Sequence, residues 1–215
     1  MDDKLHADLY FTDAKVPGYA QIGSLEGWIT KGLTEYDMAE SPKDTEWSLP
    51  ERSESIITLV KGWSNSSYRT ASLLLLKAGY NLMRRDVNDV LSEVLKIGYK
   101  LVELELATGY DAKPRIKIGL RYYHNEPVRI FIPHWLYPNL VEFANMTGIG
   151  IGFLGRMLFA YAIINSEAFK ETFDVHKRAL RDVTQFKDWL EKYLETAKYD
   201  LERAELVYSV LIREE

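Results

Sequence analysis

Basic side chains are concentrated in one stretch of the sequence, residues 113–129. It carries five bases and one acid, a net charge of +4, whereas the whole chain of 215 residues has a net charge of −5, which leaves −9 for the rest. Guanidinium and ammonium groups bind phosphate oxygens, so the stretch predicts contact with a nucleic acid backbone. The alternative is a solvated strand whose bases offset neighbouring acids. The predicted DNA-contacting residues here are Arg115, Lys117, Arg121, Tyr123, which can stack or hydrogen-bond, and Arg129.

The best support for an enzyme is a pair of Asp-x-Lys triplets, at residues 13–15 and 111–113. Metal-dependent nucleases hold a divalent ion with acidic groups and orient the attacking water with a lysine. Because triplets of this kind are frequent in a chain with 32 acids, surface charge is the alternative and a nuclease is the third hypothesis. The chain has no cysteine, and its four histidines lack the spacing of a zinc site. No metal and no cofactor is therefore expected.

The basic stretch lies on elements with strand periodicity. Apolar and polar residues alternate over residues 115–123, residues 124–127 form a plausible turn, and residues 128–132 form a second alternating strand, so a hairpin is predicted. Pro133 then opens a helix with a buried stripe that ends at Gly148. A second helix runs from Ile151 to about Asn165. The glycines between them form either a flexible turn or a phosphate cradle of Gly150, Ile151 and Gly152.

A similar order of elements is predicted upstream. Residues 36–54 contain two prolines and an excess of acids, which indicates a solvated linker. Residues 55–61 are rich in β-branched side chains and predict a strand. A helix over residues 67–82 follows, and after a break at residues 83–85, Asp86 caps a second helix with a broad apolar face. Residues 1–35 show no pattern that assigns them a role.

The last fifty residues predict one long helix. They contain neither proline nor glycine, and apolar residues recur at the spacing of a continuous helical seam. This seam is either a coiled coil between subunits or a long helix folded back over the core. The seam residues are Phe186, Leu190, Tyr193, Ala197, Leu201, Ala204, Val207 and Leu211.

The two strand-helix-turn-helix units resemble the ribbon-helix-helix fold of the Arc and MetJ type of DNA-binding proteins. In the second unit the resemblance is carried by the strand at residues 128–132, Pro133, the Leu136, Leu140 and Ala144 stripe, and Gly148 at the turn. Residues 55–104 look like a looser copy, in which residues 85–91 stand where the family's second helix begins. The two copies together cover about 40% of the chain.

The resemblance implies how DNA would be bound. In that family, two antiparallel strands enter the major groove and the start of the second helix holds a phosphate. Arg129 and Phe131 would then point outward, and Gly150, Ile151 and Gly152 would hold the phosphate. Phe131 offers no hydrogen bond to a base, and Asp86 at a helix start would repel phosphate. Because one strand cannot cover its own edge, the units pair within one chain or between chains, in competition with the local hairpin.

The sequence therefore predicts a mainly helical α+β protein with tandem ribbon-helix-helix-like units, a basic β-hairpin and a long C-terminal helix. The leading function is non-enzymatic binding of double-stranded DNA as a homodimer, as a transcriptional regulator or a plasmid or viral accessory factor. A protein-protein assembly module with the same fold is the alternative. Neither a secretory signal nor a membrane span is apparent, which predicts a cytoplasmic protein. The predicted segments are 1–35, 36–54, 55–106, 107–165 and 166–215.

Overall fold

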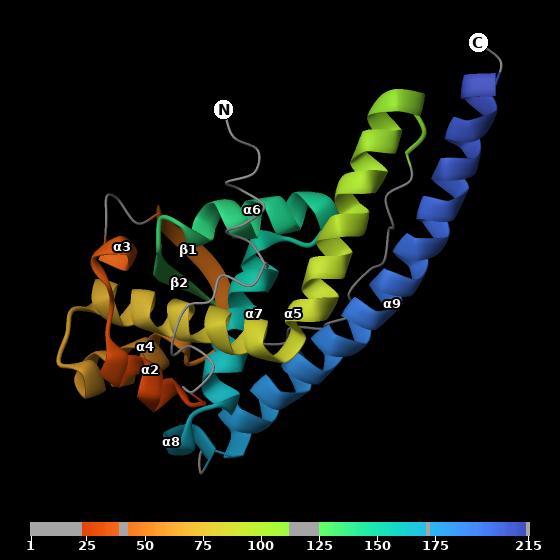
Figure 1. The fold of residues 1–215 in the computed structure, drawn as a ribbon. Coiled ribbons are helices and arrows are strands. Elements are labelled where there is room, and N and C mark those ends of the chain that lie inside the picture. Colours follow the sequence, from red (N-terminus) through yellow and green to blue (C-terminus); the bar gives the residue numbers. More distant parts are fainter. Residues whose placement is uncertain (1–22, 39–42, 112–124, 171–172, 214–215) are drawn as a thin grey trace.

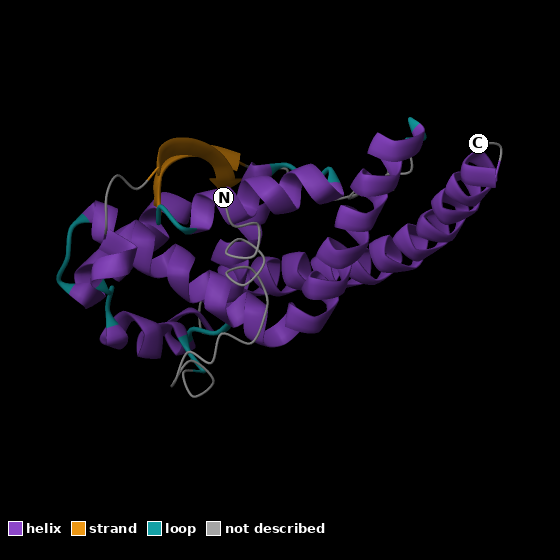
Figure 2. Cartoon of the chain, turned by 45° about the horizontal axis from the view of Figure 1, so that its top comes forward, coloured by secondary structure: helices purple, strands orange, loops and turns teal. Residues whose placement is uncertain are grey.

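The computed structural model describes residues 23–38, 43–111, 125–170 and 173–213. The chain is mostly helical with a small antiparallel sheet of two strands, as the predicted mainly helical α+β class requires (Figures 1 and 2). The elements are α2 (Leu25–Lys31), α3 (Glu35–Met38), β1 (Lys43–Pro50), α4 (Ser53–Ser64), α5 (Tyr68–Thr108), β2 (Asn125–Ile132), α6 (Leu136–Thr147), α7 (Ile151–Ile164), α8 (Glu167–Lys170) and α9 (Phe173–Arg213).

The sheet joins two strands that lie far apart in the sequence. β1 and β2 pair antiparallel, with Lys43 opposite Ile132 and Pro50 opposite Asn125. Successive side chains of a strand point to opposite faces, so one face of this two-stranded ribbon lies on the core. The buried residues of that face are Trp47, Leu49, Val128, Ile130 and Ile132.

Each strand is followed by two helices, which gives the orders β1-α4-α5 and β2-α6-α7. The second helices of the two units, α5 and α7, cross in close contact. A Cβ added at Gly79 of α5 would lie 2.0 Å from the carbonyl oxygen of Leu158 in α7. Gly155 of α7 lies in the same way beneath the ring of Trp47, to which an added Cβ would approach within 2.1 Å. Glycine at these two positions lets the helix backbones approach their neighbours closely.

The predicted positions of the first strand and of the linker are wrong. Residues 55–61 are helical and belong to α4, and β1 lies inside the segment expected to be a linker. The side chains of Ile56, Ile57 and Val60 lie on one face of α4 and are buried. Packing of that face against the core therefore overrides the strand preference of β-branched residues.

The two predicted helices at residues 67–82 and 86–102 form one element, α5. Its axis is interrupted at Val87, where φ is −129° and ψ is 20°. Two helical segments therefore meet at this kink, a few residues after the predicted break at residues 83–85, and Asp86 directly precedes it. Burial, followed by the nearby Asp86 carboxylate, raises the pKa of Tyr161, and the Tyr161 hydroxyl donates to Asp86 Oδ2 at 3.0 Å. This hydrogen bond ties the kink of α5 to α7.

α9 packs back along α5 and α7, and much of its predicted seam is buried inside the chain. Glu93 pairs with Lys198 at 2.7 Å, and Lys100 pairs with Glu205 at 3.2 Å, so α5 and α9 run parallel in matching register. Among the described residues, the buried part of the seam packs on helices of the same chain. Residues 88–108 of α5 and 190–213 of α9, called the arm below, project from the body (Figure 1).

Tyr193 anchors the base of the arm. Burial, followed by the charge of Asp200, raises the pKa of Tyr193 to about 12, so its hydroxyl stays protonated and donates to the carbonyl oxygen of Met146 at 3.1 Å. Gly98 of α5 lies against the same residue of α6, with an added Cβ 3.2 Å from Met146 Cβ. The end of α6 therefore holds α5 and α9 together where they leave the body.

Asp37 is the buried polar centre of the N-terminal region. It accepts hydrogen bonds from Thr34, from Lys77 of α5, and from Trp135 Nε1 at 3.1 Å. Burial by itself raises the pKa of Asp37, but the hydrogen bonds from Lys77 and Thr34 outweigh it and the pKa lies below its ordinary value.

This depressed pKa predicts acid sensitivity. A carboxyl with a lower pKa in the folded state contributes stability that is present above its unfolded pKa of about 4 and is lost as pH falls through the folded pKa. We expect urea midpoints to decline over that window in the natural chain, and to decline less in Asp37→Asn. Equal slopes in the two proteins would contradict this assignment.

Within the described ranges, no single helix has both the length and the apolar content of a membrane span. α6 and α7 taken together have the length and composition of a membrane span, but the pair is bent by 118° at the break between them. Most of α7 is buried, including Leu154, Leu158 and Ala162.

Candidate nucleic-acid interface

The ribbon presents one face away from the core. The alternation that buries Trp47 and Val128 turns every second side chain of each strand outward. Across the strands, Asp44 lies opposite Phe131, Glu46 opposite Arg129, and Ser48 opposite Pro127. This outward face carries two acids and one base. Arg129 and Phe131 lie on it, at the orientation that the resemblance implies.

Arg129 does not extend freely from the ribbon. Its Nε donates to the two carboxylate oxygens of Asp44 at 3.1 and 3.2 Å, and its second nitrogen completes a bidentate pair. The hydrogen bond from Arg129 lowers the pKa of Asp44 and raises that of Arg129. The guanidinium also lies 5.3 Å from the centre of the Phe131 ring, within range of a cation–π contact. Asp44 thus neutralises the one base of the outward face.

The start of α5 lies beside the ribbon. Ser67 caps the helix by accepting from the Thr70 amide at 3.1 Å, and the Tyr68 hydroxyl donates to the carbonyl oxygen of Arg129 at 3.3 Å. Arg69, in the first turn, is exposed. The first turn of α5 therefore combines backbone amides at a helix start with hydroxyls and a base, a set that suits a phosphate.

The start of α7 lies at the other unit. Gly150 is its N-cap residue and forms no side-chain capping hydrogen bond. A Cβ added at Gly150 or Gly152 would meet nothing within 4 Å, so the backbone there is open. Gly148 ends α6 with φ at 73°, a conformation that favours glycine. The predicted phosphate cradle of Gly150, Ile151 and Gly152 coincides with this helix start.

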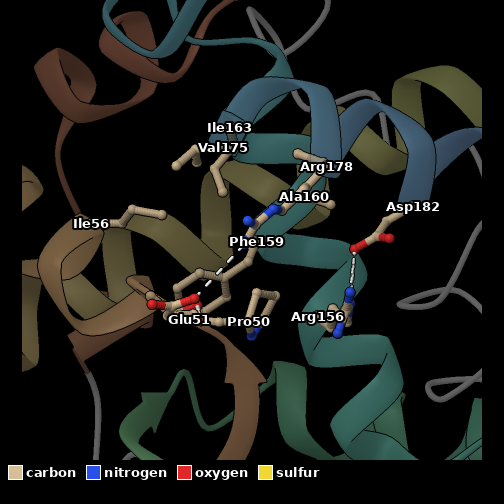
Figure 3. A pocket seen from close by; sticks show the side chains of 12 residues that line it. Pro50, Glu51, Ile56, Arg156, Phe159, Ala160, Ile163, Val175, Arg178 and Asp182 are labelled. Carbon is tan, nitrogen blue, oxygen red and sulfur yellow. Dashed lines mark hydrogen bonds and ion pairs between the residues drawn. The ribbon is translucent and has the colours of Figure 1, made fainter. Parts of the chain in front are cut away.

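A separate small pocket lies between the end of β1, α4, α7 and α9. Its walls are mostly apolar, and its charged residues pair with each other. Arg156 is held by Asp182 at 2.7 Å, and Arg178 lies 4.0 Å from Glu51 (Figure 3). The acids of this pocket therefore already have basic partners. Across the residues that the structure describes, no group of three acidic or histidine side chains could hold a metal ion.

Several predicted residues lie outside the described part of the chain. These are Arg115, Lys117, Arg121 and Tyr123, together with the first triplet of the nuclease hypothesis and Lys113 of the second. The same holds for the first strand of the predicted hairpin. Among the described residues, the partner of β2 is β1.

The sequence prediction misses the outward residues of β1, which are Asp44, Glu46 and Ser48. Charged residues and prolines dominate residues 36–54 and indicate a linker there. A short alternation is present, since Trp47 and Leu49 are apolar and their neighbours are polar. The resemblance puts the second helix start of the first unit at residues 85–91, whereas in the observed order β1-α4-α5 the second helix begins at Tyr68.

Comparisons with known proteins give no relative of this chain. No protein-family model, no curated protein and no solved structure matches it.

Proposed function

We propose that the chain is a tandem ribbon-helix-helix protein that binds double-stranded DNA through the β1-β2 ribbon. The proposal is carried by one observation: two successive β-α-α units pair their strands antiparallel within a single chain. The ribbon-helix-helix family inserts such a pair of strands into the major groove. Both the proposed fold family and the proposed function rest on that resemblance.

The first turns of α5 and α7 would bind phosphates on the two sides of the groove. Backbone amides at a helix start, together with the helix dipole, favour an anion. Arg69 and the Ser67 hydroxyl add side-chain donors at α5, and the open backbone of Gly150 and Gly152 allows close approach at α7. These contacts position the protein on the duplex and carry no sequence information.

The outward face of the ribbon would read the bases. Carboxylates such as Glu46 accept from the amino group of cytosine, an arginine such as Arg129 donates to guanine, and the Phe131 ring contacts a thymine methyl group. Arg129 must leave Asp44 to reach a base, which costs part of the gain from that contact. Phosphate contacts therefore supply most of the affinity.

The expected result is salt-dependent binding of duplex DNA. Phosphate contacts from Arg115, Lys117 and Arg121 contribute roughly −2.7 to the slope of log affinity against log salt, and the slope of the variant with all three replaced by Ala is shallower by that amount. Fluorescence anisotropy of a labelled duplex measures both slopes. Lys192→Ala, an exposed base on α9, serves as the control and leaves the slope unchanged. Absence of binding at about 50 mM salt overturns the proposal.

A second candidate is a protein-protein assembly module with the same fold. It is favoured by the two acids on the outward ribbon face and by the pairing of Arg129 with Asp44. Asp44→Asn separates the candidates, because it releases Arg129 and removes a negative charge. Duplex affinity rises in Asp44→Asn if the ribbon meets DNA, and is unaffected if the ribbon contacts a protein.

A further inference from the structure

The arm carries an exposed apolar stripe that the chain does not cover with its described residues. Tyr199, Leu206 and Val210 of α9 are 60%, 65% and 50% exposed. With Arg203, which lies over the Tyr199 ring, they follow one another at intervals of four, three and four residues. At 100° per residue they share one side of α9, opposite the side on which Ala197 and Ala204 are buried.

The apolar character of this side is confined to the arm. Towards the body, the same side of α9 carries Asp188, Lys192 and Glu195, which are charged and exposed. Figure 1 shows that the last turns of α9 extend beyond the body, where no other labelled helix except the end of α5 reaches them. Alternating intervals of three and four residues are the spacing of a helix-helix seam. α9 therefore has two seams, one used against α5 and one left open.

We propose that the open seam binds the open seam of a second copy of this chain, with the two α9 helices antiparallel. A two-fold interface needs a patch that complements itself. In the antiparallel register that places Arg203 against Leu206 of the other copy, Tyr199 lies against the other Val210. The Tyr199 and Val210 side chains of the two copies then cover each other, and the aliphatic stem of each Arg203 covers Leu206 of the other copy.

Charge selects this orientation. In the antiparallel register, Arg203 of each copy comes within reach of Glu202 of the other, which lies one turn from Leu206. A parallel pairing would place Arg203 directly against Arg203 and Glu202 beside Glu202, which is repulsive. The same sequence is thus complementary to itself in one direction and not in the other. The ribbon takes no part in this interface, so the inference is independent of DNA binding.

The oligomeric state tests the proposal. Light scattering on the full chain is expected to show a dimer that dissociates on dilution, and Leu206→Glu together with Val210→Glu raises the dissociation constant roughly tenfold or more. Leu180→Glu, at a 49% exposed position of α9 outside the arm, is the matched control and leaves the dimer intact. Circular dichroism verifies that each variant remains helical. A monomer at all concentrations, or equal dissociation constants for both variants, overturns the proposal.

Cysteine crosslinking tests the orientation, because the natural chain contains no cysteine. One protein carries Arg203→Cys and a second carries Leu206→Cys. In the antiparallel register, disulfide-linked dimers form when the two are mixed, because positions 203 and 206 lie opposite each other. Crosslinking of each protein with itself, and none between the two, would indicate parallel helices and contradict the register.

Discussion

The Asp182→Asn variant is expected to lose about 3–5 kcal/mol of unfolding free energy, the range for breaking a buried ion pair by removing one partner. Asp182 is 2% exposed and accepts from Arg156 Nε at 2.8 Å. Asparagine keeps the shape and removes the charge, so the buried guanidinium of Arg156 loses this carboxylate. Urea denaturation of the two proteins measures the difference.

The matched control removes both charges. A double variant, Arg156→Met with Asp182→Leu, is expected to regain most of the lost stability, because neither charge of the pair remains. Lys170→Ala, which breaks the exposed pair with Glu167, costs less than about 1 kcal/mol. A double variant as unstable as Asp182→Asn would show that the effect comes from packing and not from charge.

Gly79→Ala is expected to cost about 3 kcal/mol, at the upper end of the range for overpacking. The added Cβ would lie 2.0 Å from the Leu158 carbonyl oxygen and 2.6 Å from its carbon, and both atoms belong to the backbone of α7. A side chain can rotate away from such a contact, but a helix backbone must move as a whole. α5 and α7 would therefore separate at the centre of the core.

Gly62→Ala is expected to change the stability in the opposite direction. Gly62 lies in α4 and an added Cβ meets nothing within 4 Å, so alanine is expected to stabilise the chain by about 0.5–1 kcal/mol. Thermal or urea unfolding of both variants compares the two glycines directly. A neutral Gly79→Ala would mean that α5 and α7 are less tightly packed than the structure shows.

The second unit was predictable because its signals are local. Alternation over residues 128–132 marks the second part of β2, and Gly148 ends α6 as expected. The strand begins at Asn125, so residues 125–127 belong to β2 and their prediction as a turn is wrong. α6 begins at Leu136, slightly after Pro133, and α7 ends at Ile164, one residue before the predicted Asn165. Strand alternation and helix ends of this kind depend on residues that are close in the sequence, so a single sequence is enough to predict them.

The first unit was not predictable, because contacts distant in the sequence determine it. Only Trp47 and Leu49 of β1 are buried, and its charged residues are those of a linker. What makes residues 43–50 a strand is the backbone of β2, which lies about eighty residues away in the sequence. Whether the C-terminal seam packs within the chain likewise depends on a distant element, because its partner is the long second half of α5, which runs parallel to α9.

The covalent link between the two strands gives the ribbon a direction. In a ribbon made by two identical chains, both strands present the same side chains, so the surface has two-fold symmetry and looks the same from either end. Here one strand contributes Asp44, Glu46 and Ser48, and the other contributes Pro127, Arg129 and Phe131. A surface without internal symmetry matches a target without internal symmetry. Under the proposed function, such a ribbon would match a non-palindromic DNA sequence, and a single chain would suffice to bind it.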